Sequence, residues 1–220
     1  MAYRRTARIL DRLAGRRADI LRAARDTAAE QGLAAVQIVP VAERAGIAAG
    51  TVYRYFPTKA DLMDALLAAT GEQDIAAVRS AAGEAPGPLS ALAAAILAFA
   101  AGAARRPRLV AAMLSERWER TAAGSFAYRT EVIVEFEKAI RAAVDAGHLP
   151  LQDPRMAAAA ILGALVECGA GPLSQLGKPG QGALRLAAQS AALLALRALG
   201  IPDSRARGLI VQARWPAGEG

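Results

Sequence analysis

Apolar residues recur along most of this chain at every third or fourth position, which is the spacing of a helix that buries one face. Between residues 16 and 30 the positions that keep this spacing are Ile20, Leu21, Ala24, Thr27 and Ala28, and Gly32 supplies a stop. No stretch sustains the alternation of apolar and polar residues that a half-buried strand requires. The pattern therefore predicts an all-α fold.

Glycine, proline and capping residues set the expected limits of the other helices. Two short helices are predicted over residues 39–45 and 49–55, and Thr58 with Asp61 forms a capping box before a long helix over 59–80. Five further helices are predicted at 89–104, 107–121, 124–146, 154–168 and 182–199, with Pro154 in a first turn. The sequence thus predicts about nine helices.

The same glycine, proline and capping residues, together with the charge pattern, divide the chain into four parts. We expect a basic N-terminal arm (1–17), a three-helix helix-turn-helix domain (18–60), a larger helical domain (61–202) and a flexible tail (203–220). The break from Ala82 to Pro88 marks a connection within the larger domain, and residues 169–182 form a loop rich in glycine and proline.

Composition and charge sharpen this division. Hydrophobic residues make up 54% of the chain and aromatics only 5%, and much of the apolar content is alanine, the best helix former. Of the net charge of +7, residues 1–59 carry +6, from 11 basic and 5 acidic side chains. This distribution indicates an N-terminal part that binds a polyanion and a nearly neutral remainder, and it does not fit a uniformly basic protein as well.

Several classes of protein are disfavoured. Charged residues interrupt the apolar runs, so we expect no membrane-spanning helix and no membrane partner. Residues 1–18 lack the continuous apolar core of a signal peptide. The single cysteine, Cys168, cannot form an intrachain disulfide, and a reducing cytoplasm is the simplest location.

Two short helices joined by a glycine turn behind a basic segment have the layout of a helix-turn-helix. Gly46 permits the reversal, Ile47 lies between the helices, and the side chains expected to face inward are Val41, Ala42, Val52 and Phe56. The second helix then presents to solvent Ala49, Gly50, Thr51, Tyr53, Arg54 and Tyr55. Hydroxyls of Thr51, Tyr53 and Tyr55 can donate to phosphates, and Lys59 adds charge. Arg54 suits a guanine edge in the major groove. The alternative is that the tyrosines join Phe56 in an aromatic core.

The run AERAGIAAGTVYRYFPTKADLMDALL resembles the DNA-binding signature of the TetR-like (tetracycline-repressor-like) family of transcriptional regulators. The resemblance covers residues 20–67, and the matching positions are Ala42, Ala45, Gly46, Ile47, Gly50, Val52, Tyr53, Tyr55, Phe56, Lys59 and Leu62. It implies an all-α homodimer whose recognition helix is 49–55, with Gly50 and Arg54 near base edges and Gln37 among the DNA contacts. The chain departs from the family pattern at Thr27-Ala28, Val36-Gln37 and Ala48.

The resemblance also implies that the larger domain binds a ligand and dimerises. Its last two long helices would pair with the partner subunit through small residues, namely Ala157, Ala160, Ala164, Ala187, Ala191 and Ala195, unless these pack internally. The large side chains available for a pocket, each of which could equally be core, are Phe99, Met113, Trp118, Phe126, Tyr128, Phe136 and Cys168. Because no cluster of unpaired charges is found there, we expect a small apolar effector.

We therefore expect a ligand-responsive repressor that binds a palindromic DNA operator as a dimer and is released by its effector. Activation in place of repression stays open. The recognition helix, 49–55, is called the reader below. The alternative of a helical module whose reader no longer binds DNA is disfavoured, because residues 53–59 of the signature are intact. The basic arm either contacts the DNA minor groove or backbone, or only keeps the protein soluble.

Catalysis and metal binding lack the residues they require. The one histidine, His148, and Cys168 stand twenty positions apart, so no nucleophile and base come together in sequence. We expect no enzyme activity, no metal site and no cofactor, with Cys168 a small buried side chain or, alternatively, a redox sensor.

Overall fold

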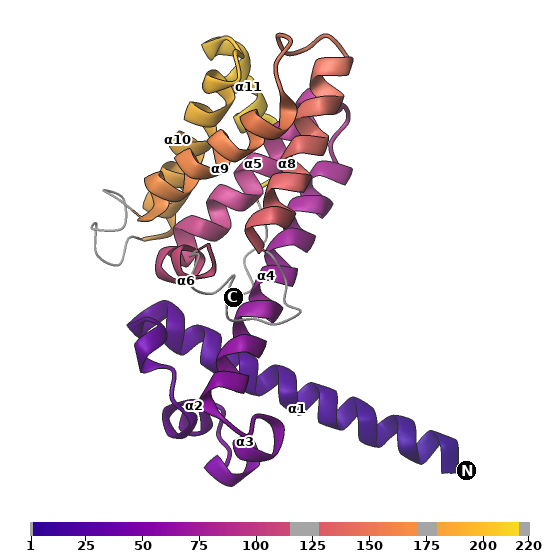
Figure 1. The fold of residues 1–220 in the computed structure, drawn as a ribbon, viewed down its shortest axis with the longest axis vertical. Coiled ribbons are helices and arrows are strands. Elements are labelled where there is room, and N and C mark those ends of the chain that lie inside the picture. The colour runs from indigo at the N-terminus through magenta and orange to yellow at the C-terminus, as the bar shows by residue number, and fades with distance from the viewer. Residues whose placement is uncertain (1, 115–127, 171–179, 216–220) are drawn as a thin grey trace. The chain divides into compact units, whose positions relative to one another are not determined.

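A computed structural model describes residues 2–114, 128–170 and 180–215 (Figure 1). Every regular element in these ranges is helical, which confirms the all-α fold. The helices of the N-terminal part are α1 (Ala2–Gln31), a 3-10 turn (Leu33–Ala35), α2 (Ile38–Arg44), α3 (Ala49–Tyr55) and α4 (Lys59–Gly83). Those of the C-terminal part are α5 (Pro88–Arg105), α6 (Pro107–Met113), α8 (Tyr128–Asp145), α9 (Pro154–Ala170), α10 (Gln181–Ala198) and α11 (Asp203–Gln212).

The chain forms two compact units, Met1–Thr70 and Gly71–Gly220. In the first unit α1 packs against the 3-10 turn and α2, and α2 packs against α3. The stripe predicted on α1, from Ile20 to Ala28, is buried as expected, and it faces a core that includes Val41 and Val52. These contacts fix the orientation of the helix-turn-helix within its own unit.

Helix α1 begins earlier than the sequence pattern predicted. The segment expected to be a separate arm, residues 1–17, is helical from Ala2 and continuous with the packed part of α1. Arginine, leucine and alanine are all good helix formers, and Gly15 is the one residue of this segment with a strong cost, about 1 kcal/mol relative to alanine. Apolar periodicity located the packed part of the helix but not its full length.

Helix α4 starts with the predicted capping box. The Thr58 hydroxyl accepts from the backbone N–H of Asp61 at 3.1 Å, and the Asp61 carboxylate accepts from the backbone N–H of Thr58 at 2.9 Å. The residues that precede α2 and α3, Gln37 and Ala48, form no side-chain cap. The departure noted at Ala48 therefore leaves α3 without a side-chain cap.

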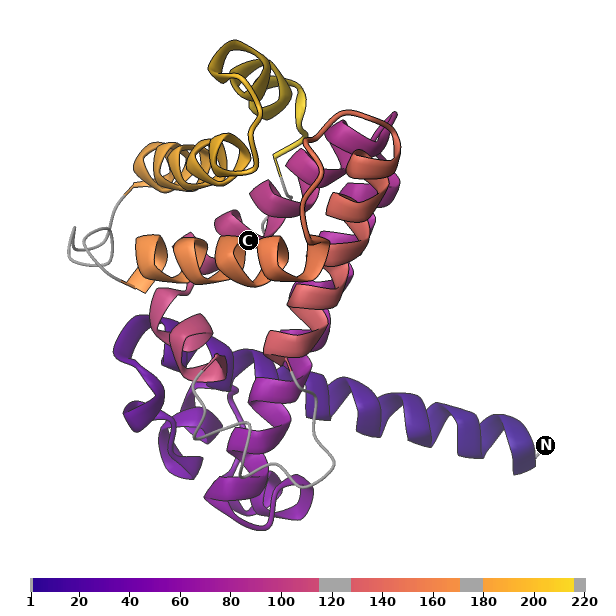
Figure 2. The ribbon, with the colours of Figure 1, turned by 45° about the horizontal axis from the view of Figure 1, so that its top comes forward.

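In the second unit α5 is the central helix. It packs against α8, α9, α10 and α11 (Figure 2). Every position of α5 from Leu92 to Ala103 is buried. By length and composition α5 could cross a membrane, so the expectation that charges break every apolar run is wrong here. However, 72% of this helix is buried inside the structure, as in the core helix of a folded domain.

The end of the chain is more ordered than expected. Residues 203–212 of the predicted tail form α11, which buries Ala206 and Ile210 and packs on α5 and α10. Pro154 does begin α9, as its first-turn position predicted. The predicted end of the helix at 107–121 and the predicted start of the helix at 124–146 fall within 115–127, outside the described residues.

Helices α9 and α10 pack on each other, but not all of their alanines are outward. Ala191 and Ala195 are buried in the interior of their own unit, so the outward alanine face predicted on α10 is wrong at these two positions. The exposed positions of α10 include Leu186 and Leu194, each one residue before a predicted alanine. A spacing of four between alanines identified a close-packing face but could not tell which side of α10 it occupied.

Candidate nucleic-acid interface

The turn between α2 and α3 is a glycine C-cap. Gly46 has a φ of 66°, a left-handed conformation that favours glycine. The backbone N–H of Gly46 donates to the Glu43 carbonyl at 3.1 Å, and that of Ile47 donates to the Ala42 carbonyl at 3.0 Å. This pair of bonds is a Schellman motif, which satisfies two carbonyls at the end of α2 and reverses the chain into α3.

Helix α3 has one buried side and one open side. Val52 within it and Phe56 directly after it are fully buried, as predicted for the inward residues. Gly50, Tyr53 and Arg54 are exposed, with 51% of the Tyr53 surface accessible. Three further predicted contact residues are half-buried, namely Ala49, Thr51 and Tyr55. Because Phe56 alone joins the core, the alternative that all three aromatics are core does not apply to Tyr53.

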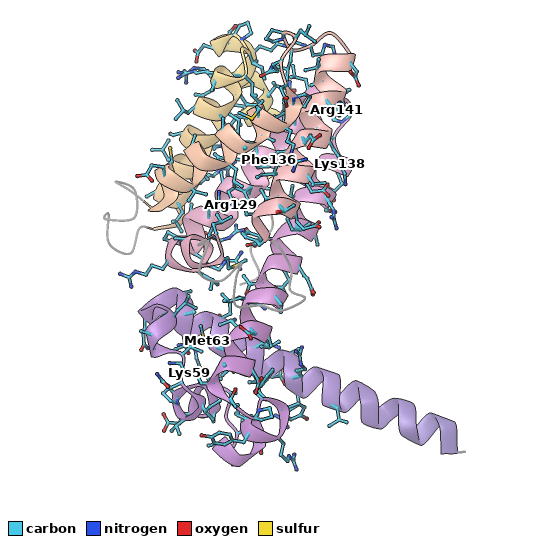
Figure 3. The ribbon with its side chains drawn as sticks, viewed as in Figure 1. Lys59, Met63, Arg129, Phe136, Lys138 and Arg141 are labelled. Carbon is cyan, nitrogen blue, oxygen red and sulfur yellow. The ribbon has the colours of Figure 1, made fainter. Side chains whose placement is uncertain are left out.

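The remaining predicted DNA contacts flank α3. Gln37 is exposed at the start of α2, where its amide donates to the Ala34 carbonyl at 3.1 Å. Lys59 is exposed in the first turn of α4, one turn before Met63 (Figure 3). Neither Arg54 nor Lys59 forms an ion pair with another described residue, so both cations are available to an anion.

Two side chains that hold this surface in place were not predicted. Arg44 donates to both carboxylate oxygens of Glu30, at 2.9 and 2.6 Å, and this hydrogen-bonded pair raises the pKa of Arg44. The Arg17 guanidinium lies 5.3 Å from the centroid of the Phe56 ring, a cation–π distance. The first contact joins α1 to α2, and the second joins α1 to the residue that follows α3. Sequence periodicity gives no signal for partners so far apart in the chain.

The candidate ligand contacts lie in the second unit. Phe99, Met113, Tyr128 and Phe136 are buried, and the rings of Phe99 and Phe136 meet edge to face, 5.7 Å between centroids. Cys168 is half-buried as a free thiol, and Trp118 and Phe126 lie outside the described residues. Ligand contact by any of these seven residues stays a prediction.

A polar cluster that the sequence did not reveal lies beside these aromatic residues. Asp74 is buried, accepts from the Arg106 guanidinium at 2.5 Å, and accepts from the Tyr128 hydroxyl at 3.1 Å. Burial and the neighbouring Asp74 carboxylate raise the pKa of Tyr128 well above its usual value. A signal was present, since Asp74 continues the buried row of Leu62, Leu66 and Thr70 at intervals of four.

Arg105 adds a second cation near this cluster. It is half-buried, and burial together with the adjacent Arg106 lowers its pKa. No ion pair joins it to another described residue. Within the described ranges, no group of three His, Cys, Asp or Glu side chains is placed to hold a metal ion.

Comparisons with known proteins give one family match and one match to a curated relative. Residues 20–66 match the bacterial regulatory proteins of the tetR family. The HTH-type transcriptional repressor KstR of Rhodococcus jostii (strain RHA1) is 51% identical over 53 residues, which are 24% of this chain and 25% of that protein. The match thus spans about a quarter of this curated relative.

Solved structures extend the likeness to the whole fold. The unliganded structure of RolR aligns over 91% of this chain and 98% of its own, with a TM-score of 0.61 and 19% identity. FadR from Bacillus subtilis, in complex with stearoyl-CoA, aligns over 80% and 96%, with a TM-score of 0.65 and 20% identity. At these identities the likeness establishes the fold, an N-terminal helix-turn-helix followed by a helical domain.

Proposed function

Because this chain belongs to the tetR family of bacterial regulatory proteins by its N-terminal domain, we propose that it is a ligand-responsive transcriptional repressor. The observation that carries the proposal is the surface of α3. There Gly50, Tyr53 and Arg54 are exposed on a helix that is packed through the buried Val52 and joined to α2 by the Schellman turn. Residues 20–66, which match the tetR family, include these helices.

In this proposal α3 enters the major groove. The hydroxyls of Thr51, Tyr53 and Tyr55 and the Lys59 ammonium bind phosphates, which position the protein without reading sequence. Arg54 donates to the edge of a guanine, and Gly50 lets the backbone approach the bases. Gln37 and Ala49 contact the DNA at the entrance of α2 and α3.

The proposed unit of function is a homodimer. Large apolar side chains stay exposed on the packed pair α9 and α10, namely Met156, Leu186 and Leu194. Small or uncharged neighbours, among them Ala160, Gly163 and Ser190, are exposed beside them. Burying this surface against its copy would give a two-fold protein, which matches a palindromic operator with two readers in successive major grooves.

The effector is proposed to be small and largely apolar, and to bind in the second unit near Phe99 and Phe136. RolR has been solved with resorcinol and FadR with stearoyl-CoA, which supports a ligand site in this fold. Helix α4 starts directly after the reader and reaches the buried Asp74. A ligand that favours a different position of α4 would release DNA, provided that it binds the released conformation more tightly.

A cytoplasmic regulator that is neither an enzyme nor a membrane protein completes the proposal. His148 is exposed after the end of α8, in a Schellman-type turn where its N–H donates to the Ala143 carbonyl at 2.9 Å. Cys168 lies on α9. These two side chains therefore occupy separate elements.

The test is fluorescence anisotropy of the full chain on duplex DNA from beside its own gene, with scrambled competitor and a salt series. We expect tight, salt-sensitive binding that survives the competitor. If that DNA is not preferred, selection from a random duplex pool replaces it. A chain that enriches no sequence from the pool would contradict the proposed function.

A further inference from the structure

We propose that the N-terminal half of α1, residues 2–17, is a second DNA-binding element that holds the phosphate backbone beside the site read by α3. The inference rests on the proposed function, since it requires the first unit to bind duplex DNA. It chooses between the two roles that the sequence left open for this basic segment.

The positive charge of the first unit is confined to this segment. Residues 1–18 contain six arginines and one aspartate, a net charge of +5, whereas residues 19–70 contain five basic and six acidic side chains, a net charge of −1. Two of those five, Arg22 and Arg44, are paired with Asp19 and Glu30. The part of the unit that carries α3 therefore has no net positive charge to attract a polyanion.

The side chains that the structure describes in this segment are not part of the core of the unit. Its described side chains, Leu13, Arg16 and Arg17, are exposed, and the buried residues of α1 begin at Ile20. The packed half of α1 provides a nucleus for this half, but the described residues before Ile20 add no buried surface of their own. A partner that binds the segment would supply the stabilisation that the core of the unit does not.

The order of the arginines indicates that this partner is an anion. Arg4, Arg8, Arg12 and Arg16 recur at every fourth position, which is one row along the face of a helix. Like charges at this spacing repel one another, and Asp11 is the one acidic residue in the segment. The phosphates of duplex DNA remove this repulsion and release counterions as they bind.

The segment also begins next to α3, the proposed recognition helix. The Arg17 guanidinium lies 5.3 Å from the centroid of Phe56, the residue that follows α3, so this point of α1 is fixed at the end of the reader. From Arg17 to Ala2 the helix extends about 22 Å at 1.5 Å per residue. That length equals roughly six base pairs at 3.4 Å each. Figure 1 shows α1 continuing well past α2 and α3 toward the N-terminus.

The test compares the full chain with the triple variant R4A/R8A/R12A. One control, R4K/R8K/R12K, keeps the charge, and a second, R141A/R155A/R205A, removes the same charge from exposed positions of the other unit. The probes are two duplexes that share one site selected by the full chain, the first ending at the site and the second flanked by about ten base pairs on each side. Kd is measured by anisotropy across a salt series, and circular dichroism checks the helix content.

We expect the alanine variant to bind the flanked duplex about tenfold to a hundredfold more weakly near 0.15 M salt, with a salt slope lower by about 2 to 3. The two controls should match the wild type, and the short duplex should bind wild type and alanine variant alike. Equal salt slopes for wild type and alanine variant on the flanked duplex would overturn the inference and leave the proposed function standing. The same loss in the second control would overturn it too. A wild-type chain that prefers no duplex would overturn both.

Discussion

Arg54 is the exposed side chain on α3 whose chemistry distinguishes one base pair from another. Its guanidinium has no ion-pair partner among the described residues, and a bidentate bond to guanine is worth about 1–3 kcal/mol of discrimination. We expect Arg54→Ala to relax discrimination at one base pair of each half-site by that amount. Binding to a library of single-base operator variants measures this, and an unchanged profile would remove Arg54 from base reading.

Tyr53 and Lys59 are proposed to contact phosphates, so they test binding that does not depend on base sequence. A phosphate contact carries no base information, so Tyr53→Phe and Lys59→Ala should weaken binding to every sequence by the same factor. The library used for Arg54 provides the measurement, because all points should shift together. Selective loss on one operator would contradict the assignment of these two side chains to phosphates.

Substitution of the buried Tyr128 measures how much the polar cluster of the second unit contributes to stability. Its hydroxyl donates to the buried Asp74 carboxylate, and a hydrogen bond to a charged group contributes about 1.5–3 kcal/mol. We expect Tyr128→Phe to lower the free energy of unfolding by about that amount, measured by urea denaturation at pH 8. Tyr53→Phe, at a half-exposed ring, is the matched control and should change stability by less than about 0.5 kcal/mol.

The pH dependence of this effect has a definite sign. Burial raises the pKa of Tyr128 in the folded state, so its contribution is complete below the unfolded value of about 10 and declines as pH rises above it. The difference in stability between wild type and Tyr128→Phe should therefore shrink between pH 10 and higher pH. A difference that grows over this range would contradict a raised pKa.

At the scale of single elements the capping box of α4 gives a direct test. The Thr58 hydroxyl accepts from the Asp61 N–H, and loss of such a cap costs about 1 kcal/mol. Thr58→Ala should lower the urea midpoint, whereas Thr58→Ser, which keeps the hydroxyl, should stay close to the wild type. If serine and alanine behave alike, the hydroxyl is not the group that stabilises the start of α4.

Elements were predictable wherever local chemistry defines them. Glycine, proline and capping residues gave the limits of α3 and the starts of α4 and α9 because those signals act within a few residues. The start of α1 and the existence of α11 were missed, since neither depends on a local stop signal. Asp74, Arg106 and the Arg44–Glu30 pair were missed because their partners are set by packing between helices distant in sequence. The reader surface needed only α2, its turn and α3, so more of it could be predicted.

At the scale of the whole molecule, the excess positive charge and the proposed dimer surface fall on different units. The excess positive charge is concentrated at the N-terminus of α1, while the large apolar side chains exposed on α9 and α10 are Met156, Leu186 and Leu194. Charge favours binding to DNA, and apolar surface favours binding to another protein surface. In the proposed dimer the second unit therefore supplies the interface and the first unit supplies the contact with DNA.

Dimerisation can be tested by placing a charge on that apolar surface. Leu186 and Leu194 are 66% and 49% exposed, and burying a glutamate at either position against a second copy would leave an unpaired carboxylate in an apolar interface. We expect Leu186→Glu and Leu194→Glu to give a particle of 22.8 kDa by sedimentation equilibrium, in place of one with twice that mass. Operator affinity should fall in parallel, because a monomer offers one reader to two half-sites.

The matched control for this test is Val211→Glu on α11, where the native side chain is 81% exposed but lies off the α9–α10 pair. It should remain dimeric with unchanged operator affinity. Monomers for all three variants would show that any added charge disrupts assembly, and dimers for all three would move the interface elsewhere. Loss of dimer at Leu186 and Leu194 alone would assign the two-fold axis to α9 and α10, and would fix which surface brings two copies of α3 to one palindrome.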